Sequence, residues 1–162
     1  MDSLKIGNIT LPHRAVFGPM AGFTDAPCRR LMAQHGAGFT VSEMVSSRAL
    51  VYHDHKTVSL LKAEPNGAPY GVQIFGEVPQ IMGEAAAAIE EYQFDFLDIN
   101  MGCPAPKIVS GGARPTADQS LERADGLSGN ITDATRVADE RSSPRLVFGV
   151  VGGVLQSLMR SL

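Results

Sequence analysis

The chain has 162 residues, a net charge of −3 and 44% apolar residues. This length supports one domain with a substantial core, and the charge gives no sign of a broad basic surface for nucleic acid. Its two cysteines, Cys28 and Cys103, lack both zinc-ligand spacing and the density of a disulfide framework. No apolar leader or membrane-length segment is present, so we expect a cytoplasmic protein without membrane or metal.

The first hundred residues alternate between short apolar runs and helical patterns bounded by caps, glycine or proline. A Gly-Asn pair between two apolar triplets is typical of a β-hairpin. In chain order we expect a hairpin over 4–11, a strand over 15–20, a helix from 24 or 25 to about 35, a strand over 39–42, irregular helix over 46–62, a strand over 70–75, a helix over 78–92 and a strand over 96–100. This alternation favours βαβ units and a parallel sheet.

Each expected strand ends in polar or glycine-rich residues. A TIM-type barrel collects its active-site residues at this end of every strand, whereas a doubly wound sheet concentrates them at one switch point. No Gly-x-Gly-x-x-Gly phosphate loop follows the first strand. We therefore predict an α/β fold of the TIM-barrel type, of which this chain holds the N-terminal half, about four βα units after an N-terminal hairpin.

The most informative segment is 96–107, a short apolar strand followed by Gly-Cys-Pro and a lysine. A strand that ends in this way delivers Asn100 and Cys103 to the mouth of the sheet. Gly102 permits a sharp turn and Pro104 restricts the backbone after the thiol. This setting favours a chemical role for Cys103 over that of a packed structural thiol.

Five motifs, taken together, resemble the tRNA-dihydrouridine synthase family, most closely its bacterial B-type branch. They occupy residues 4–8, 18–25, 41–44, 72–76 and 98–107, and the resemblance covers residues 1 to about 112. It implies a TIM barrel that binds FMN, followed by a helical tRNA-binding domain. Such an enzyme reduces a uridine in tRNA to dihydrouridine and takes its electrons from NADPH.

The resemblance also implies a role for each matching residue. Hydride from the flavin goes to C6 of uracil, and a thiol that is largely protonated at neutral pH can then donate a proton at C5. The implied roles are flavin contacts through backbone groups of Pro19, Met20 and Ala21, a hydrogen bond from Gln73 to the isoalloxazine edge, a uracil contact from Asn100, and general acid catalysis by Cys103.

Structural roles are the alternatives for several of these residues. Gln73 would then satisfy polar groups at a strand end, and Met20 would fill the core. We interpret Glu43 as a solvated or ion-paired carboxylate and Cys28 as inert packing within the first helix.

The family pattern ends after residue 112. All four lysines precede residue 110, whereas six of the ten arginines follow it. We therefore predict a barrel part over 1–112 and a tail over 113–162 that is either translated out of frame from a GC-rich gene or divergent but real. Residues 114–145 have little periodicity, which is compatible with disorder, and 147–158 are apolar enough for a strand or helix.

A complete barrel needs about 250 residues, so we expect open strand edges that invite self-association. We also expect weak FMN binding and little or no turnover by this chain alone. Two other functions stay open. One is a different FMN-dependent TIM-barrel oxidoreductase that acts on a free pyrimidine. The other is a non-enzymatic remnant, or a half-barrel that assembles with a partner.

Overall fold

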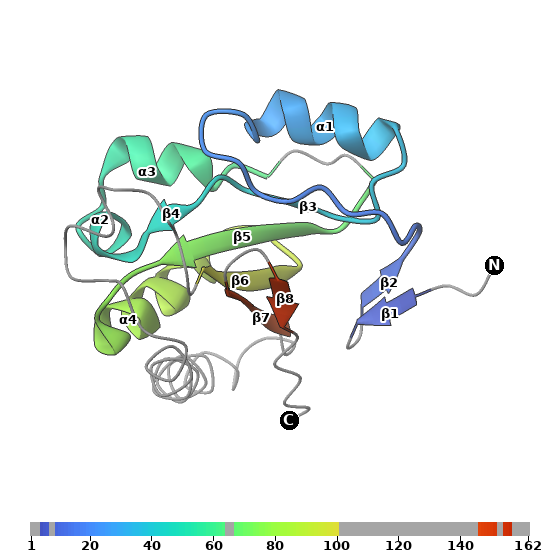
Figure 1. Ribbon diagram of the computed structural model, residues 1–162. Coiled ribbons are helices and arrows are strands. Elements are labelled where there is room, and N and C mark those ends of the chain that lie inside the picture. The colour runs from blue at the N-terminus through green and yellow to red at the C-terminus, as the bar shows by residue number, and fades with distance from the viewer. Residues whose placement is uncertain (1–3, 7–8, 64–66, 101–145, 152–153, 157–162) are drawn as a thin grey trace.

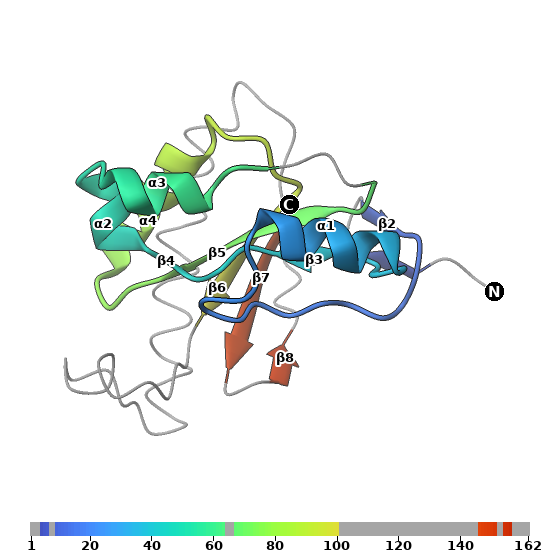
Figure 2. The ribbon, with the colours of Figure 1, turned by 90° about the horizontal axis from the view of Figure 1, so that it is seen from above.

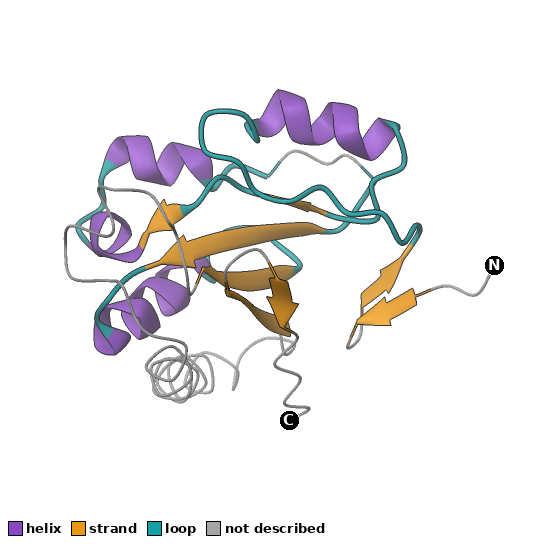
Figure 3. Ribbon diagram, in the orientation of Figure 1, coloured by secondary structure: helices purple, strands orange, loops and turns teal. Residues whose placement is uncertain are grey.

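The computed structural model describes residues 4–6, 9–63, 67–100, 146–151 and 154–156 (Figure 1). They form an α/β structure built on a mainly parallel sheet, as the alternating pattern predicts (Figure 3). The elements are β1 (Leu4–Ile6), β2 (Ile9–Leu11), α1 (Ala26–Gln34), β3 (Thr40–Val41), β4 (Val45–Ser46), α2 (Ser47–Val51), α3 (His55–Leu60), β5 (Tyr70–Phe75), α4 (Pro79–Ile89), β6 (Phe96–Asn100), β7 (Leu146–Val151) and β8 (Val154–Gln156).

The main sheet has the strand order β3-β5-β6-β7-β8. β3 and β4 pair with opposite ends of the same side of β5, so the two short strands act as one interrupted neighbour. All pairs are parallel except β7 with β8. Among the described residues the strands form an open sheet and do not close into the expected barrel.

The expected hairpin is confirmed as an antiparallel pair of β1 and β2. The first helix is also confirmed, and Asp25 caps it by accepting a hydrogen bond from the backbone N–H of Cys28. The strand expected over 15–20 is reduced to one bridge between Phe17 and Thr40. Pro19 contributes to this difference because it has no N–H to donate to a ladder.

Two other expected segments acquire definite structure. The irregular helix over 46–62 consists of α2 and α3, which are capped by the side chains of Ser46 and Asp54. His53, between them, has a positive φ of 55° and interrupts the helical path. In the tail, the apolar segment 147–158 supplies β7 and β8.

The core lies on both faces of the sheet because side chains alternate along β5 and β6. On one face, Val72, Ile74, Leu97 and Ile99 pack in a cluster with α2 and α4. On the other face, Phe96 packs with Phe39, Val41 and Leu11 beside the hairpin. Figure 1 shows the hairpin near the amino-terminal end of β5, and Figure 2, seen from above, shows α1 lying over β3. The second face of the sheet is thus apolar near the amino-terminal ends of β5 and β6.

Gly71 provides the space that the ring of Phe96 fills. The two residues are paired in the register of β5 and β6, and a Cβ atom at Gly71 would collide with the Phe96 ring. Phe96 in turn contacts Phe39 edge to face, with ring centroids 5.0 Å apart. We predict that Gly71→Ala lowers the free energy of unfolding by about 2 kcal/mol, because the ring must move within a packed core.

Urea unfolding followed by circular dichroism measures this loss. Gly18→Ala is the matched control, since a Cβ atom at Gly18 meets no heavy atom within 4 Å. Equal stability of the two variants would contradict the packing described for Phe96.

Candidate active site

A buried polar pair occupies the middle of the face that carries Phe96. The parallel register places Gln73 of β5 opposite Asp98 of β6. The Gln73 Nε2 donates to Asp98 Oδ2 over 2.6 Å. Gln73 is 2% exposed and Asp98 is 3% exposed. Both side chains are therefore removed from water. In the protein interior hydrogen bonds are electrostatically strong and unpaired polar groups are costly.

Asn100 extends this pair to the carboxyl end of β6. Its Nδ2 donates to Gln73 Oε1 over 3.2 Å and lies 3.9 Å from the Met44 sulfur. Asn100 is only partly buried, and Met44 directly precedes β4. A continuous network of polar side chains thus runs from the buried Asp98 to the strand ends, where a parallel α/β sheet binds its ligands.

Burial raises the pKa of Asp98 from 3.8 to about 6, although hydrogen bonds from Gln73 and the Ile99 backbone oppose the shift. Its second oxygen, Oδ1, is buried and has no hydrogen-bond partner among the described residues. A carboxylate with one unpartnered oxygen is an expensive group to bury. Perturbed groups of this kind are concentrated at functional sites.

The loop that follows the 15–20 segment is held by its own hydrogen bonds. The hydroxyl of Thr24, which is fully buried, accepts from the N–H of Met20 over 3.0 Å and donates to its carbonyl over 3.1 Å. Arg29 donates to the Thr24 carbonyl over 2.7 Å and lies 4.7 Å from the centroid of the Tyr70 ring. The turn is therefore anchored to both α1 and β5.

Glu43 joins this loop to the next strand end. Its Oε2 accepts a 2.7 Å hydrogen bond from the N–H of Gly22. Gly22 has a φ of 78°, in the region that glycine adopts without steric cost. The sequence interpretation of Glu43 as a solvated or ion-paired carboxylate misses this bond. A carboxylate at one strand end and a glycine turn at another were visible in the sequence, but their contact depends on tertiary structure.

The structure brings Gln73 and Asn100 together as hydrogen-bond partners. Pro19, Met20 and Ala21 lie on the first loop, where Met20 is 46% exposed, so the alternative that Met20 fills the core is wrong. The backbone N–H and carbonyl of Met20 are both bonded to Thr24. What Met20 directs outward is therefore its side chain. Cys103 lies outside the described residues.

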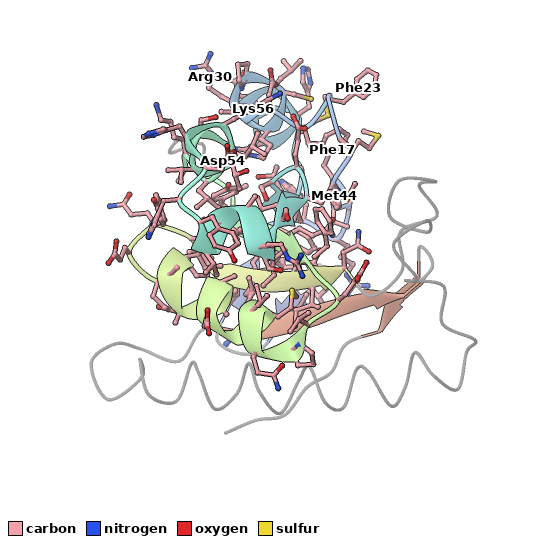
Figure 4. All side chains as sticks on the ribbon, turned by 90° about the vertical axis from the view of Figure 1, so that its left-hand side faces the viewer. Phe17, Phe23, Arg30, Met44, Asp54 and Lys56 are labelled. Atoms are coloured by element: carbon pink, nitrogen blue, oxygen red, sulfur yellow. The ribbon has the colours of Figure 1, made fainter. Side chains whose placement is uncertain are left out.

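Figure 4 shows the labelled Phe23 projecting from the first loop at the rim of the molecule, while Met44 lies nearer the sheet. Phe23 is 71% exposed. Within the described ranges, no three His, Cys, Asp or Glu side chains are placed to hold a metal ion. No helix in this part of the chain is long and apolar enough to span a membrane.

The sequence profile of the family described as dihydrouridine synthase (Dus) matches residues 16–114, which include every element from α1 to β6. The chain belongs to the dihydrouridine synthase family. It is 40% identical over 134 residues to tRNA-dihydrouridine synthase B of Pseudomonas aeruginosa, and this match covers 83% of the chain. It is 42% identical over 105 residues to tRNA-dihydrouridine synthase B of Vibrio vulnificus, over 65% of the chain.

A protein of Rickettsia bellii named as a probable tRNA-dihydrouridine synthase is 37% identical over 81% of the chain. The chain spans 39% of the length of this relative and of the Pseudomonas protein, and 33% of the Vibrio protein. The family profile ends close to the boundary expected at residue 112, but the Pseudomonas match covers 134 residues and so extends past it. The site described above lies within the profile match.

The raised pKa of Asp98 has a consequence for stability. Since the unfolded chain has an ordinary carboxyl pKa of 3.8 and the folded chain one of about 6, the folded state binds more protons between these values. The free energy of unfolding should therefore fall as pH rises from about 4 to 6 and then level off. We predict that Asp98→Asn removes this dependence and raises stability at pH 7 by roughly 2 kcal/mol.

Urea unfolding at pH about 4.5, 6 and 7.5, at and about 1.5 units either side of the folded-state pKa of Asp98, tests this sign. Asp95→Asn is the control, because Asp95 lies just before β6 and accepts from the N–H of Tyr70 over 2.7 Å. If wild-type stability instead increases from pH 4.5 to 6, and Asp98→Asn abolishes the increase, folding lowers the pKa of Asp98 and the predicted direction is wrong.

The bond from Gly22 to Glu43 predicts local protection of the first loop. Glu43→Ala should accelerate amide hydrogen exchange at Gly22, whereas Glu43→Gln keeps an oxygen acceptor and should retain most of the protection. Exchange measured by NMR on the whole chain reports both variants. Unchanged exchange at Gly22 in Glu43→Ala would show that the bond does not hold the loop.

Proposed function

We propose that this chain serves the reaction named for its relatives, the reduction of uridine in tRNA to dihydrouridine. In this proposal FMN binds across the carboxyl ends of the parallel strands, and the described sheet is the N-terminal part of a TIM barrel. The observation that carries the proposal is the network of Asp98, Gln73 and Asn100, which ends three residues before Cys103. This network would lie beside a thiol on a proline turn.

The described residues fit a flavin at this end of the sheet. An isoalloxazine ring needs an apolar surface and amide groups along its edge. The half-exposed side chain of Met20 has the first chemistry, and Gln73 would supply the second through the Nε2 hydrogen that it does not donate to Asp98. Cβ atoms at Gly18 and Gly22 would meet no heavy atom within 4 Å, so the first loop leaves open space beside it. Pro19 and Ala21 would complete this wall.

Each residue would have one task. Bound FMN, reduced by NADPH, supplies the hydride. Gln73 would hydrogen-bond the ring edge, and Asn100 would hold the uracil at the carboxyl end of β6. Cys103 would donate the proton at C5 of the uracil, as a thiol that is mostly protonated at neutral pH can do. Because hydride and proton are added to one double bond, the reduction is balanced.

Self-association belongs to the same proposal. The edge of the sheet near Phe17 is paired through a single bridge to Thr40, and lightly paired edges favour contacts with other chains. A second copy, or a partner that supplies the remaining strands, would cover it. Native mass measurement distinguishes a monomer from these assemblies.

The first experiment measures FMN binding by the quenching of flavin fluorescence. We expect weak binding by the whole chain, and a further loss of affinity of about tenfold in Gln73→Leu, since one buried hydrogen bond to the ring edge would be lost. Glu77→Gln is a control, because this exposed residue lies beyond the end of β5. Equal affinity of Gln73→Leu and wild type would count against the proposed flavin site.

The second experiment measures dihydrouridine in tRNA after incubation with FMN and NADPH. We expect a low yield from this chain and a high yield from a full-length relative. In that relative, alanine at the position matching Cys103 should lower the rate about 10²- to 10⁴-fold, the usual contribution of a general acid. Alanine at the position matching Cys28 is the control. Reduction of a free pyrimidine but not of tRNA would favour the other flavin-dependent oxidoreductase.

A further inference from the structure

Asp98 has no task in the reaction proposed above. It is 3% exposed, and its Oδ1 has no hydrogen-bond partner among the described residues. A neutral residue of the same size would avoid the cost of burying a charge. The carboxyl group nevertheless lies in contact with Gln73, which connects it to Asn100. Its chemistry therefore bears on how these two amides are oriented.

A carboxylate can only accept hydrogen bonds, whereas a primary amide can donate from nitrogen and accept at oxygen. Asp98 must therefore face the Nε2 of Gln73, and this contact is 2.6 Å long. The Oε1 of Gln73 is then directed to the other side, where it accepts from the Nδ2 of Asn100. One charged group thus sets the direction of two successive amides.

The direction of the Asn100 amide matters because Asn100 lies at the outer end of the network, at the carboxyl end of β6. With its Nδ2 directed to Gln73 and Met44, Asn100 has its carbonyl Oδ1 on the opposite side of its amide group. A carbonyl oxygen accepts from the N3–H of uracil, whereas N3 of cytosine is itself an acceptor and would be repelled. A site that hydrogen-bonds one partner rejects a partner of the opposite polarity because polar groups are left unpaired.

We propose that Asp98 is a positioning residue that fixes the hydrogen-bond direction of Gln73 and Asn100, the two amides to which the proposed function gives the flavin edge and the uracil. This inference deepens the proposed function and rests on it for the identity of the base. The orientation itself is a property of this chain and can be measured without a ligand.

The substitution Asp98→Asn removes the constraint. The introduced amide could accept from Gln73 through its oxygen or donate to Gln73 through its nitrogen, so both directions of the Gln73 amide would be satisfied. In the double variant Gln73→Glu, Asp98→Asn the acceptor-only group moves to β5. The introduced asparagine and Asn100 would then both donate to the introduced carboxylate. The direction of Asn100 is restored although the charge has moved to a different strand.

Nitrogen-15 NMR of the side-chain amides in the whole chain tests this proposal. We expect one pair of Asn100 Nδ2 signals in wild type, doubled or exchange-broadened signals in Asp98→Asn, and a single pair again in the double variant. Asp95→Asn, the matched carboxylate control at the other end of β6, should leave the Asn100 signals unchanged. Backbone amide spectra establish that each variant is folded.

The wild-type Asn100 signals should also shift as Asp98 is protonated. The other side chains of this network, Gln73, Asn100 and Met44, carry no charge, so a shift with pH reports the protonation of Asp98. Unaltered Asn100 signals in Asp98→Asn, or failure of the double variant to restore them, would overturn the proposal. FMN titration of the same wild-type sample tests the proposed function separately. Absence of flavin binding would count against that function and leave the NMR result for Asp98 unchanged.

Discussion

The parallel pairing of β5 with β6 is the constraint on which the site depends. Its register sets Gly71 against Phe96 and Gln73 against Asp98. A slip by one residue would turn the polar side chains toward the helices and the apolar ones away from them. The helices α2 and α4 prevent this because they bury Val72, Ile74, Leu97 and Ile99 on their own side. Packing on one face thereby holds a polar network in place on the other.

The polar face changes character along the strands. Near the hairpin, Phe96 packs against Phe39 and Leu11. Two residues further along β5 and β6, on the same face, lie the buried Gln73 and Asp98, and Asn100 follows at the partly exposed end. This gradient explains why the pKa of Asp98 is raised. Asp98 is close enough to the apolar cluster around Phe96 to be shielded from water, yet it belongs to the polar network. Such a compromise between stability and chemistry is common in active sites.

The first loop is held by contacts that differ in kind from those of the sheet. Thr24 closes the turn locally, Arg29 ties it to α1 and Tyr70, and Glu43 reaches it from the neighbouring strand end. The bonds to Thr24 use the N–H and carbonyl of Met20, whereas the residue as a whole stays 46% exposed. Loops built in this way can present residues accurately although they lie outside the regular sheet.

Local sequence patterns were enough to predict the hairpin, α1, β5, α4 and β6, because caps, glycine turns and apolar periodicity act over a few neighbouring residues. The resemblance of five motifs between residues 4 and 107 indicated the family, which the match over residues 16–114 bears out. Tertiary structure alone decided that residues 15–20 form only a bridge, that Glu43 binds Gly22, and that Asp98 accepts from the amide of Gln73. These features join residues 21 to 25 positions apart, and a contact over such a distance depends on strand register and burial, which no local pattern encodes.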